Sequence, residues 1–133
     1  MLEKLQNELK KSYAPYSNFH VSAIVITKDE KEFSGVNVEN ASFGATICAE
    51  RVAITKAVSE GCTKGDFKEI HILNDGENKA MPCFLCRQVF MEFFDQETKI
   101  YVYDQQGDKI VLTLNDVCPY PFSEEDLKWK VDL

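Results

Sequence analysis

Three cysteines and one glutamate lie near the starts of two expected helices. Cys48 and Glu50 share one segment, and Cys83 and Cys86 form a Cys-x-x-Cys pair in the other. Such a pair at the mouth of a helix can present two sulfurs to one ion, and a neighbouring helix start can supply a third sulfur. Thiolate ligands in four-coordinate geometry favour zinc, and the positive ends of helix dipoles help to keep thiols ionised. The spacing therefore predicts a zinc site with three protein ligands.

Glu50 is the residue best placed to move protons beside that metal. Three protein ligands leave a fourth position open to water, which distinguishes a catalytic zinc site from a closed structural one. Glu50 follows Cys48 by two residues, about 200° further round a helix at roughly 100° per residue. The two side chains can therefore converge only on something beyond the helix end. A carboxylate held there can take a proton from water and pass it to a substrate nitrogen.

The two arginines of the chain, Arg51 and Arg87, both stand beside the expected metal-binding segments. Zinc with three thiolates carries a net negative charge, and a guanidinium that donates to sulfur would withdraw part of it. We expect Arg51 to do this. Arg87 fits an interface or surface position equally well.

Hydrophobic spacing and turn residues predict how the chain positions these groups. Helical spacing of Leu2, Leu5 and Leu9 indicates a first helix, and Thr46 is a plausible N-cap for the helix that carries Glu50. The Glu50 helix is expected to end near 59, with Gly61 as its stop, and two further helices are expected, one from Pro82 to about 94 and one that starts at Ser123. The expected strands are 19–27, 32–39, 68–74, 99–103 and 109–114. This order predicts an α/β fold: a five-stranded mixed sheet between helices, with the site at helix amino termini.

Length and composition limit the class of protein. With 133 residues and a hydrophobic content of 44%, the chain predicts one domain over residues 1–133. A net charge of -7 without Lys/Arg clustering disfavours a nucleic-acid polymer as partner. The longest apolar runs are too short to span a bilayer, and no segment reads as an export signal. Five cysteines in such a chain favour a reducing, cytoplasmic location and metal or core thiols over disulfides.

The segments that carry these residues resemble the zinc-dependent nucleoside deaminases, and within them the small homotetrameric cytidine deaminases. The resemblance covers essentially the whole chain. It is carried, in order, by SYAPYSNF at 12–19, GVNVENAS at 35–42, CAER at 48–51, PC at 82–83, CRQV at 86–89 and FSEEDL at 122–127.

The resemblance implies a three-layer α/β/α fold and a hydrolase acting on a cyclic amidine. Cytidine and deoxycytidine would be converted to uridine and deoxyuridine with release of ammonia, in pyrimidine salvage. It further implies one zinc ion per subunit, held by Cys48, Cys83 and Cys86, and a cytoplasmic homotetramer. Glu50 would carry protons to N3 of the pyrimidine and then to the departing amine.

The resemblance also implies a set of substrate contacts. Asn37 and Glu39 would bind the ribose hydroxyls, which agrees with the common face shared by residues i and i+2 of a strand. Phe19 would pack against the base and the backbone of Ala49 would meet the base carbonyl. Phe122 would close the pocket of an adjacent subunit.

Some positions depart from the family pattern. Phe84 follows Cys83 where glycine is usual, Ser22 and Ile24 stand where small residues are common, and Cys118 replaces an aliphatic residue. We expect local repacking at Ser22 and Ile24. At Phe84 we expect either a contact with a neighbouring subunit or an altered backbone around the Cys-x-x-Cys pair.

Three other functions fit parts of the pattern. A deaminase of another aminated ring, such as the blasticidin deaminases, shares the metal motif, but the Asn37 and Glu39 pair favours a nucleoside. A zinc-stabilised interaction module needs a fourth protein ligand, and Cys62, Cys118, His20 and His71 are the only ones available. A thioredoxin-like oxidoreductase at Cys83 and Cys86 leaves Cys48 unexplained.

Overall fold

The computed structural model describes residues 1–130, and residues 131–133 of the expected domain lie outside the described residues. From the first helix to the fifth strand, the helices and strands follow the expected order. The elements are α1 (Leu2–Leu9), β1 (Val21–Thr27), β2 (Glu32–Val36), a 3-10 turn (Phe43–Ala45), α2 (Ala49–Ser59), β3 (Phe67–Asn74), α3 (Phe84–Phe93), β4 (Lys99–Tyr103), β5 (Lys109–Leu112), α4 (Leu114–Val117) and a 3-10 helix (Glu124–Lys130). The strands expected over 19–27 and 32–39 are shorter, Val21–Thr27 and Glu32–Val36, so Asn37 and Glu39 lie just beyond the end of the second strand.

Five strands form one mixed sheet in the order β2-β1-β3-β4-β5. The pairs β1–β2 and β4–β5 are antiparallel hairpins, as expected for strands joined by tight turns. β3 and β4 pair in parallel, with α3 as the connection between them. β3 pairs antiparallel with β1, which places β2 at one edge of the sheet. The expected mixed five-stranded sheet is therefore confirmed.

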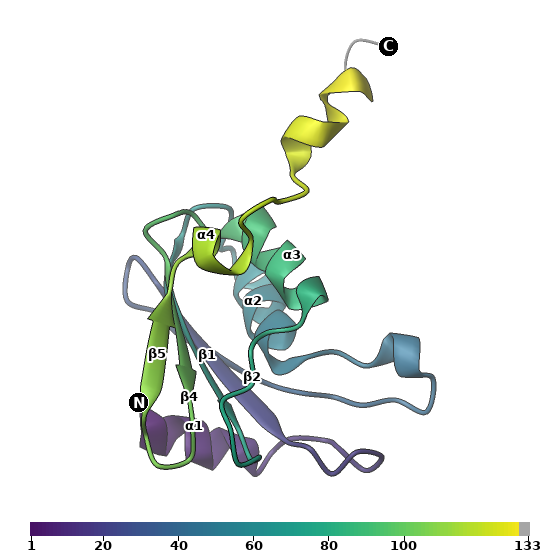
Figure 1. Cartoon of the computed structure of the whole chain (residues 1–133), viewed down its shortest axis with the longest axis vertical. Coiled ribbons are helices and arrows are strands. Elements are labelled where there is room, and N and C mark those ends of the chain that lie inside the picture. Colours follow the sequence, from purple (N-terminus) through teal and green to yellow (C-terminus); the bar gives the residue numbers. More distant parts are fainter. Residues whose placement is uncertain (131–133) are drawn as a thin grey trace.

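Helices cover both faces of the sheet, which gives the three layers (Figure 1). α2, α3 and α4 pack on one face over the larger apolar core, which includes Ile54, Phe67 and Phe90. α1 covers the other face over a smaller core, in which Leu5 packs against Leu73. Beyond α4 the chain leaves the sheet, and its last described helical segment projects away from the body of the molecule (Figure 1).

The departures at Ser22 and Ile24 are absorbed on the side of α1. The Ser22 hydroxyl is fully buried and donates to the carbonyl of Leu5 at 2.8 Å. Ile24 belongs to the smaller core with Leu5 and Tyr103. One buried hydrogen bond and one apolar contact at these two positions thus fasten α1 to β1.

The starts of the two site helices differ from the expected positions. Cys48, and not Thr46, is the N-cap of α2, because the Thr46 hydroxyl accepts instead from the Asn40 amide at 3.1 Å. Cys83 is the N-cap of α3, one residue after Pro82. Neither cysteine makes a side-chain capping hydrogen bond. Each sulfur therefore lies at a helix mouth without serving the helix itself.

The C-terminal region contains a helix that the hydrophobic pattern missed. The strand expected over 109–114 ends at Leu112, and Thr113 then caps α4 through a reciprocal capping box with Asp116. A threonine followed three residues later by an acidic residue is a sequence signal for such a box. The short helix expected after Ser123 is a 3-10 helix.

Within the part of the chain that the structure describes, no helix combines the length and apolar character that crossing a bilayer requires.

Candidate metal centre and nucleoside site

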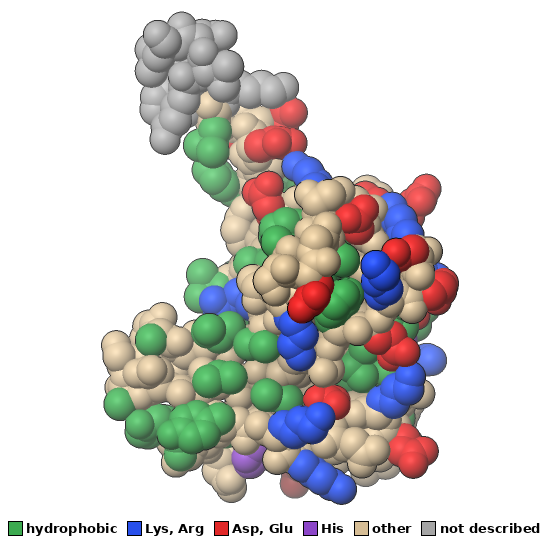
Figure 2. All heavy atoms as spheres, turned by 180° about the vertical axis from the view of Figure 1, so that it is seen from behind, with side chains coloured by type: hydrophobic (Ala, Val, Ile, Leu, Met, Phe, Trp, Pro, Cys, Tyr) green, Lys and Arg blue, Asp and Glu red, His purple; other side chains and the backbone are tan. Residues whose placement is uncertain are grey.

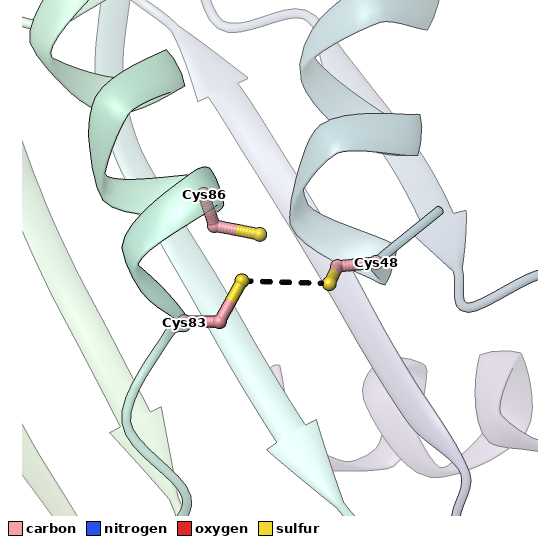
Figure 3. Close-up of side chains that lie close together, drawn as sticks. All are labelled: Cys48, Cys83 and Cys86. Atoms are coloured by element: carbon pink, nitrogen blue, oxygen red, sulfur yellow. Dashed lines mark hydrogen bonds between the residues drawn. The ribbon is translucent and has the colours of Figure 1, made fainter. Parts of the chain in front are cut away.

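The three cysteines at the two helix starts converge on one point (Figure 3). The sulfurs of Cys48, Cys83 and Cys86 all lie within 4.8 Å of one another. The sulfur of Cys48, from the mouth of α2, is 3.7 Å from that of Cys83, at the mouth of α3. Cys86 lies one turn into α3 and is buried, whereas Cys83 is exposed. The cluster is therefore open on one side.

This arrangement fits a zinc ion. Sulfurs about 2.3 Å from a tetrahedral zinc lie about 3.8 Å from one another, close to the separation of Cys48 and Cys83. Three thiolates brought this close repel each other unless a cation lies between them. The donor set is entirely thiolate, the kind of ligand that zinc accepts readily. These residues can thus hold zinc through three sulfurs, as the sequence predicted.

Arg51 lies beside the cluster and donates to it. Its guanidinium nitrogen Nη2 is 3.4 Å from the sulfur of Cys48. A hydrogen bond with Cys86, together with this guanidinium, lowers the pKa of Cys48 to about 5. The hydrogen bond with Cys48 and burial raise the pKa of Cys86. The expected contact between Arg51 and a thiolate is therefore present.

Glu50 points from the first turn of α2 toward the same cluster. Its side chain is buried, with 5% of the residue exposed. The pKa of its carboxyl is raised to about 7, mainly by burial and also by the charge on Cys48, while a backbone hydrogen bond and one with Cys86 oppose the shift. A carboxyl with a pKa near neutrality can both accept and release a proton. Its convergence with Cys48 at the end of the helix is the arrangement that the two-residue spacing predicted.

Gly35 in β2 lets α2 approach the sheet closely. A Cβ built on Gly35 would lie 2.4 Å from the carbonyl oxygen of Ala49 and 2.4 Å from the nitrogen of Ala53. Only glycine fits between strand and helix at this distance. The start of α2, which carries Cys48 and Glu50, is therefore held directly against β2.

A pair of backbone hydrogen bonds joins the metal cluster to the segment of Glu39. Val38 and Ile47 exchange both of their N–H and C=O groups at 2.9 Å. Because Glu39 follows Val38 and Cys48 follows Ile47, this bridge brings the two functional segments side by side. A cavity of about 360 Å³ opens here, lined by Tyr16, Ser17, Glu39, Asn40, Phe43 and Thr46.

The Glu39 carboxylate is fixed by the loop that precedes β1. It accepts from the amides of Tyr16 at 3.0 Å and Ser17 at 3.1 Å, and from the Ser17 hydroxyl. These bonds, led by the one from the Ser17 hydroxyl, lower the pKa of the Glu39 carboxyl. The carboxylate is thus kept ionised in a wall of the cavity.

Asn37 is buried and serves the same loop through both ends of its amide. Its Nδ2 donates to the carbonyl of Phe19 at 2.7 Å. Its Oδ1 accepts from the amide of Val21 at 2.9 Å and from the Ser12 hydroxyl. One N–H of the amide is committed to Phe19, which leaves the second N–H as the group that a ligand could use.

Hydrophobic side chains gather on the face that carries this loop and the segment before α2 (Figure 2). The exposed large apolar residues of these two segments are Tyr13, Tyr16, Phe19, Val38, Phe43 and Ile47. An exposed apolar surface of this kind is typical of a binding or association site.

Phe122 and Arg87 lie apart from the Glu39 cavity. Phe122 lines a separate cavity with Phe84 and Tyr120, and its carbonyl accepts from the Gln88 side chain at 2.8 Å. The Arg87 guanidinium lies 4.4 Å from the centre of the Phe84 ring and donates to the carbonyl of Pro82 at 2.7 Å. Arg87 therefore supports the start of α3, a function that the sequence, which favoured an interface or surface position equally, did not predict.

The sequence did not single out two residues that contact Glu39, one of the expected substrate-binding residues. Ser17 and Tyr16 hold Glu39, although they lie more than 20 positions earlier in the chain. They do fall in the segment SYAPYSNF, so its family resemblance was the one signal that could have drawn attention to them.

Comparisons with known proteins agree with this geometry. Residues 1–103 match the profile of the cytidine and deoxycytidylate deaminase zinc-binding region. The chain is 41% identical to a cytidine deaminase of Halalkalibacterium halodurans over 87% of this chain and 86% of that protein. It is 38% identical to a cytidine deaminase of Sporosarcina psychrophila over 98% of both. The crystal structure of cytidine deaminase from Burkholderia pseudomallei superposes with a TM-score of 0.87 at 39% identity, covering 91% of this chain and 95% of that one.

The chain therefore belongs to the cytidine deaminase family of zinc-dependent hydrolytic enzymes.

Proposed function

We propose that this enzyme converts cytidine and deoxycytidine to uridine and deoxyuridine with release of ammonia, as a step of pyrimidine salvage. The observation that carries the proposal is the open cluster of Cys48, Cys83 and Cys86, with the buried carboxyl of Glu50 directed at it. Family membership supports the same reaction.

Each residue of the centre has one task in this reaction. Cys48, Cys83 and Cys86 hold the zinc ion, and the Arg51 guanidinium offsets part of their negative charge. Bound zinc supplies Lewis acidity, which makes water a nucleophile near neutral pH. Glu50 takes one proton from the attacking water and delivers it to N3 of the pyrimidine. It then takes the second proton, from the hydroxyl group now on C4, and passes it to the departing amine, so that ammonia leaves and the C4 carbonyl of uridine forms.

Substrate binding falls to the two segments that flank the bridge between Val38 and Ile47. Glu39 accepts hydrogen bonds from the ribose hydroxyls, and Asn37 donates its second amide N–H to the sugar. Phe19 packs against the base. The Ala49 amide, which lies in the first turn of α2 and so has no acceptor within the helix, donates to the base carbonyl.

The pair formed by Glu39 and Asn37 bears on substrate class. A carboxylate and an amide two residues apart suit a sugar diol, and a free nucleobase offers no such group. A nucleoside is therefore the substrate that these residues favour. Ammonia release from cytidine, deoxycytidine, adenosine and guanine tests this. Turnover of guanine alone would contradict the preference for a nucleoside, and turnover of adenosine and guanine without cytidine or deoxycytidine would contradict the proposed substrate.

The active enzyme is proposed to be a cytoplasmic homotetramer with one zinc ion per subunit and a single domain over residues 1–133. Exposed aromatic residues near α3, with Phe84 at 77%, Tyr120 at 98% and Phe122 at 57%, support burial against other subunits. Phe122 closes the pocket of a neighbouring subunit, in keeping with its distance from the cavity of its own chain. The five free cysteines suit a reducing compartment.

Substitution of the proton carrier gives the decisive test. Glu50→Gln keeps the shape of the side chain and removes its capacity to carry a proton. We expect kcat for cytidine to fall by a factor of about 10² to 10⁴, with zinc content and melting temperature close to those of the wild type. Absorbance of the pyrimidine and metal analysis of the same preparation measure both.

Glu60→Gln is the matched control, because Glu60 caps the other end of the same helix and is exposed. Its kcat should equal that of the wild type. Full activity of the Glu50 variant would overturn the proton-transfer assignment, and absence of zinc from the wild type would overturn the metal centre.

A further inference from the structure

The backbone of Phe19, the residue proposed to pack against the base, is held by hydrogen bonds to two side chains. Its carbonyl accepts from the Asn37 side chain at 2.7 Å, and its amide donates to the Ser17 hydroxyl at 3.0 Å. Asn18, just before it, has a positive φ of 56°, a conformation that asparagine tolerates better than most residues. The backbone of Phe19 is therefore fixed, although the residue as a whole is 40% exposed.

A second clamp acts on the next residue. The carboxylate of Asp75 accepts from the backbone amide of His20 at 2.9 Å through Oδ1. Its Oδ2 lies 2.6 Å from Nδ1 of the His20 ring. The amide of Asp75 in turn donates to the carbonyl of His20 at 3.0 Å. Three hydrogen bonds thus join one residue at the start of β1 to one just beyond the end of β3.

The turn that begins with Asn74 meets the ring of Phe19 itself. The buried Asn74 side chain accepts from the amide of Gly76 at 2.7 Å and donates to the carbonyl of Asn78 at 3.0 Å. A Cβ built on Gly76 would lie 3.4 Å from Cε1 of Phe19 and 2.9 Å from Oδ1 of Asn74. The ring of Phe19 therefore lies over a position where this chain has no side chain.

We propose that the turn Asn74-Asp75-Gly76 is a positioning element that sets the place of the Phe19 ring and thereby the fit of the substrate base. Asp75 holds the backbone through His20. Gly76 lets the Asn74 side chain close the turn, and the turn lies against the Phe19 ring. The inference rests on the proposed function, because it takes Phe19 to contact the base. None of the three residues touches the metal cluster, so they act on binding and leave the chemical step unchanged.

The physical reason lies in the sensitivity of aromatic stacking to geometry. A stacked ring contributes about 0.5–1.5 kcal/mol beyond its buried area, and only when the two rings are correctly offset. A half-exposed ring with a free backbone samples several rotamers, and ordering it on binding reduces affinity. Fixing residues 19 and 20 before the ligand arrives removes that cost.

Asp75→Ala tests the proposal by a comparison of binding with turnover. We expect the dissociation constant for uridine and the KM for cytidine each to rise about three- to tenfold, the size of one lost stacking contact. The value of kcat should change by less than about twofold, because the proton-transfer groups are untouched. Calorimetry with uridine and steady-state kinetics with cytidine provide the two readouts.

A double-mutant cycle separates positioning from a general structural effect. In a Phe19→Ala background, Asp75→Ala should have almost no further effect on uridine binding, because the ring through which it acts is gone. Equal effects of Asp75→Ala with and without Phe19 would overturn the proposal. Gly76→Ala gives a second route should Asp75→Ala fold poorly, and it should weaken uridine binding only while Phe19 is present.

Asp95→Ala is the matched control. Asp95 also caps a turn, accepting from the Glu97 amide at 2.9 Å, and pairs with Lys28 at 2.7 Å, but it lies before β4 at the opposite end of the sheet. It should leave uridine binding unchanged. A wild-type enzyme that neither binds uridine nor converts cytidine would overturn the proposed function and this inference with it. Normal wild-type activity combined with unaltered binding by the Asp75 and Gly76 variants would overturn the inference alone.

Discussion

Asn37 and Glu39 show how differently two residues of one short motif are used. Asn37 is buried, and its amide holds the backbone of Phe19 and Val21 in place. Glu39 stands in a cavity wall with its carboxylate fixed by the amides of Tyr16 and Ser17. Asn37 therefore orients the loop and keeps one N–H for a ligand, whereas the loop in turn orients Glu39.

His71 is a buried histidine outside the site, and its surroundings favour the neutral ring. Its Nε2 lies 3.0 Å from the Glu69 carboxylate and its Nδ1 lies 2.7 Å from the Tyr103 hydroxyl. The ring stacks on Tyr101 at a centroid distance of 4.4 Å. Burial lowers the pKa of His71 below its usual 6.5, and Lys109 adds to the shift while Glu69 opposes it. His71 is thus a core histidine, as an isolated strand histidine usually is.

Stability should fall in acid because of His71. Since its pKa is lower in the folded state, the unfolded chain binds the proton first. The stabilisation is therefore complete above about pH 6.5 and is lost as the pH falls from there to the folded-state pKa, with a slope of at most about 1.4 kcal/mol per pH unit. Urea unfolding of the wild type and His71→Phe at pH 5 to 7.5 measures this.

His71→Phe keeps the stacking on Tyr101 but cannot titrate, so its stability should vary less with pH. The variant should also be less stable at pH 7.5 by about 1–3 kcal/mol, because the buried Tyr103 hydroxyl loses its partner. Identical pH dependence in both proteins would contradict this explanation.

At the scale of elements, the position of α2 against β2 controls the metal centre. α2 begins at the cysteine that it contributes, and β2 meets it at Gly35 with no room for a side chain. The other two sulfurs, of Cys83 and Cys86, stand at the start of α3, the helix that follows β3. The centre is therefore built by the placement of two helices on one sheet, and an error in either placement separates the sulfurs.

Gly35→Ala should disturb both stability and metal binding. The added methyl group meets backbone atoms of Ala49 and Ala53 at 2.4 Å, so helix and strand must separate. We expect a loss of about 1–3 kcal/mol or more in the free energy of unfolding and a lower zinc content after purification. Gly44→Ala is the control, because a Cβ there has no neighbour within 4 Å. Full zinc occupancy in the Gly35 variant would show that α2 can shift without cost to the centre.

At the scale of the whole molecule, the described chain exposes more aromatic surface than a small monomer needs. Apolar side chains gather on the face that carries the loops of the site (Figure 2). A second set, with Phe84, Tyr120 and Phe122, lines one cavity between the start of α3 and the segment after α4. Phe84, which stands where the family usually has glycine, is the residue of this second set that we expect to meet a neighbouring subunit.

Light scattering should give a mass of about four chains of 15.2 kDa. Phe122→Ser should shift the protein toward smaller species and reduce activity, because it removes an exposed apolar contact. Lys10→Ser, at the exposed end of α1, should leave the mass unchanged. A fully active wild-type monomer would refute the shared site.

Local patterns in the sequence accounted for the metal centre and the order of elements. Cys83 and Cys86 are close because three residues make almost one helical turn. Cys48 and Glu50 lie on different sides of their helix and converge because both stand at its first turn. The periodicities of 3.6 and 2 likewise predicted the α/β order. The capping box at Thr113 was also local, and it could have revealed α4.

Only the tertiary structure decided which distant residues support the substrate site. His20 and Asp75 lie 55 positions apart and meet because β1 and β3 pair in one particular register. Strand register depends on the packing of the entire sheet and leaves no mark at the two residues themselves. The same holds for Gly35 beneath α2, for Ser17 against Glu39, and for Phe19 over Gly76. The chemistry of the centre follows from spacing along the chain, and the fit of the pocket follows from how the sheet assembles.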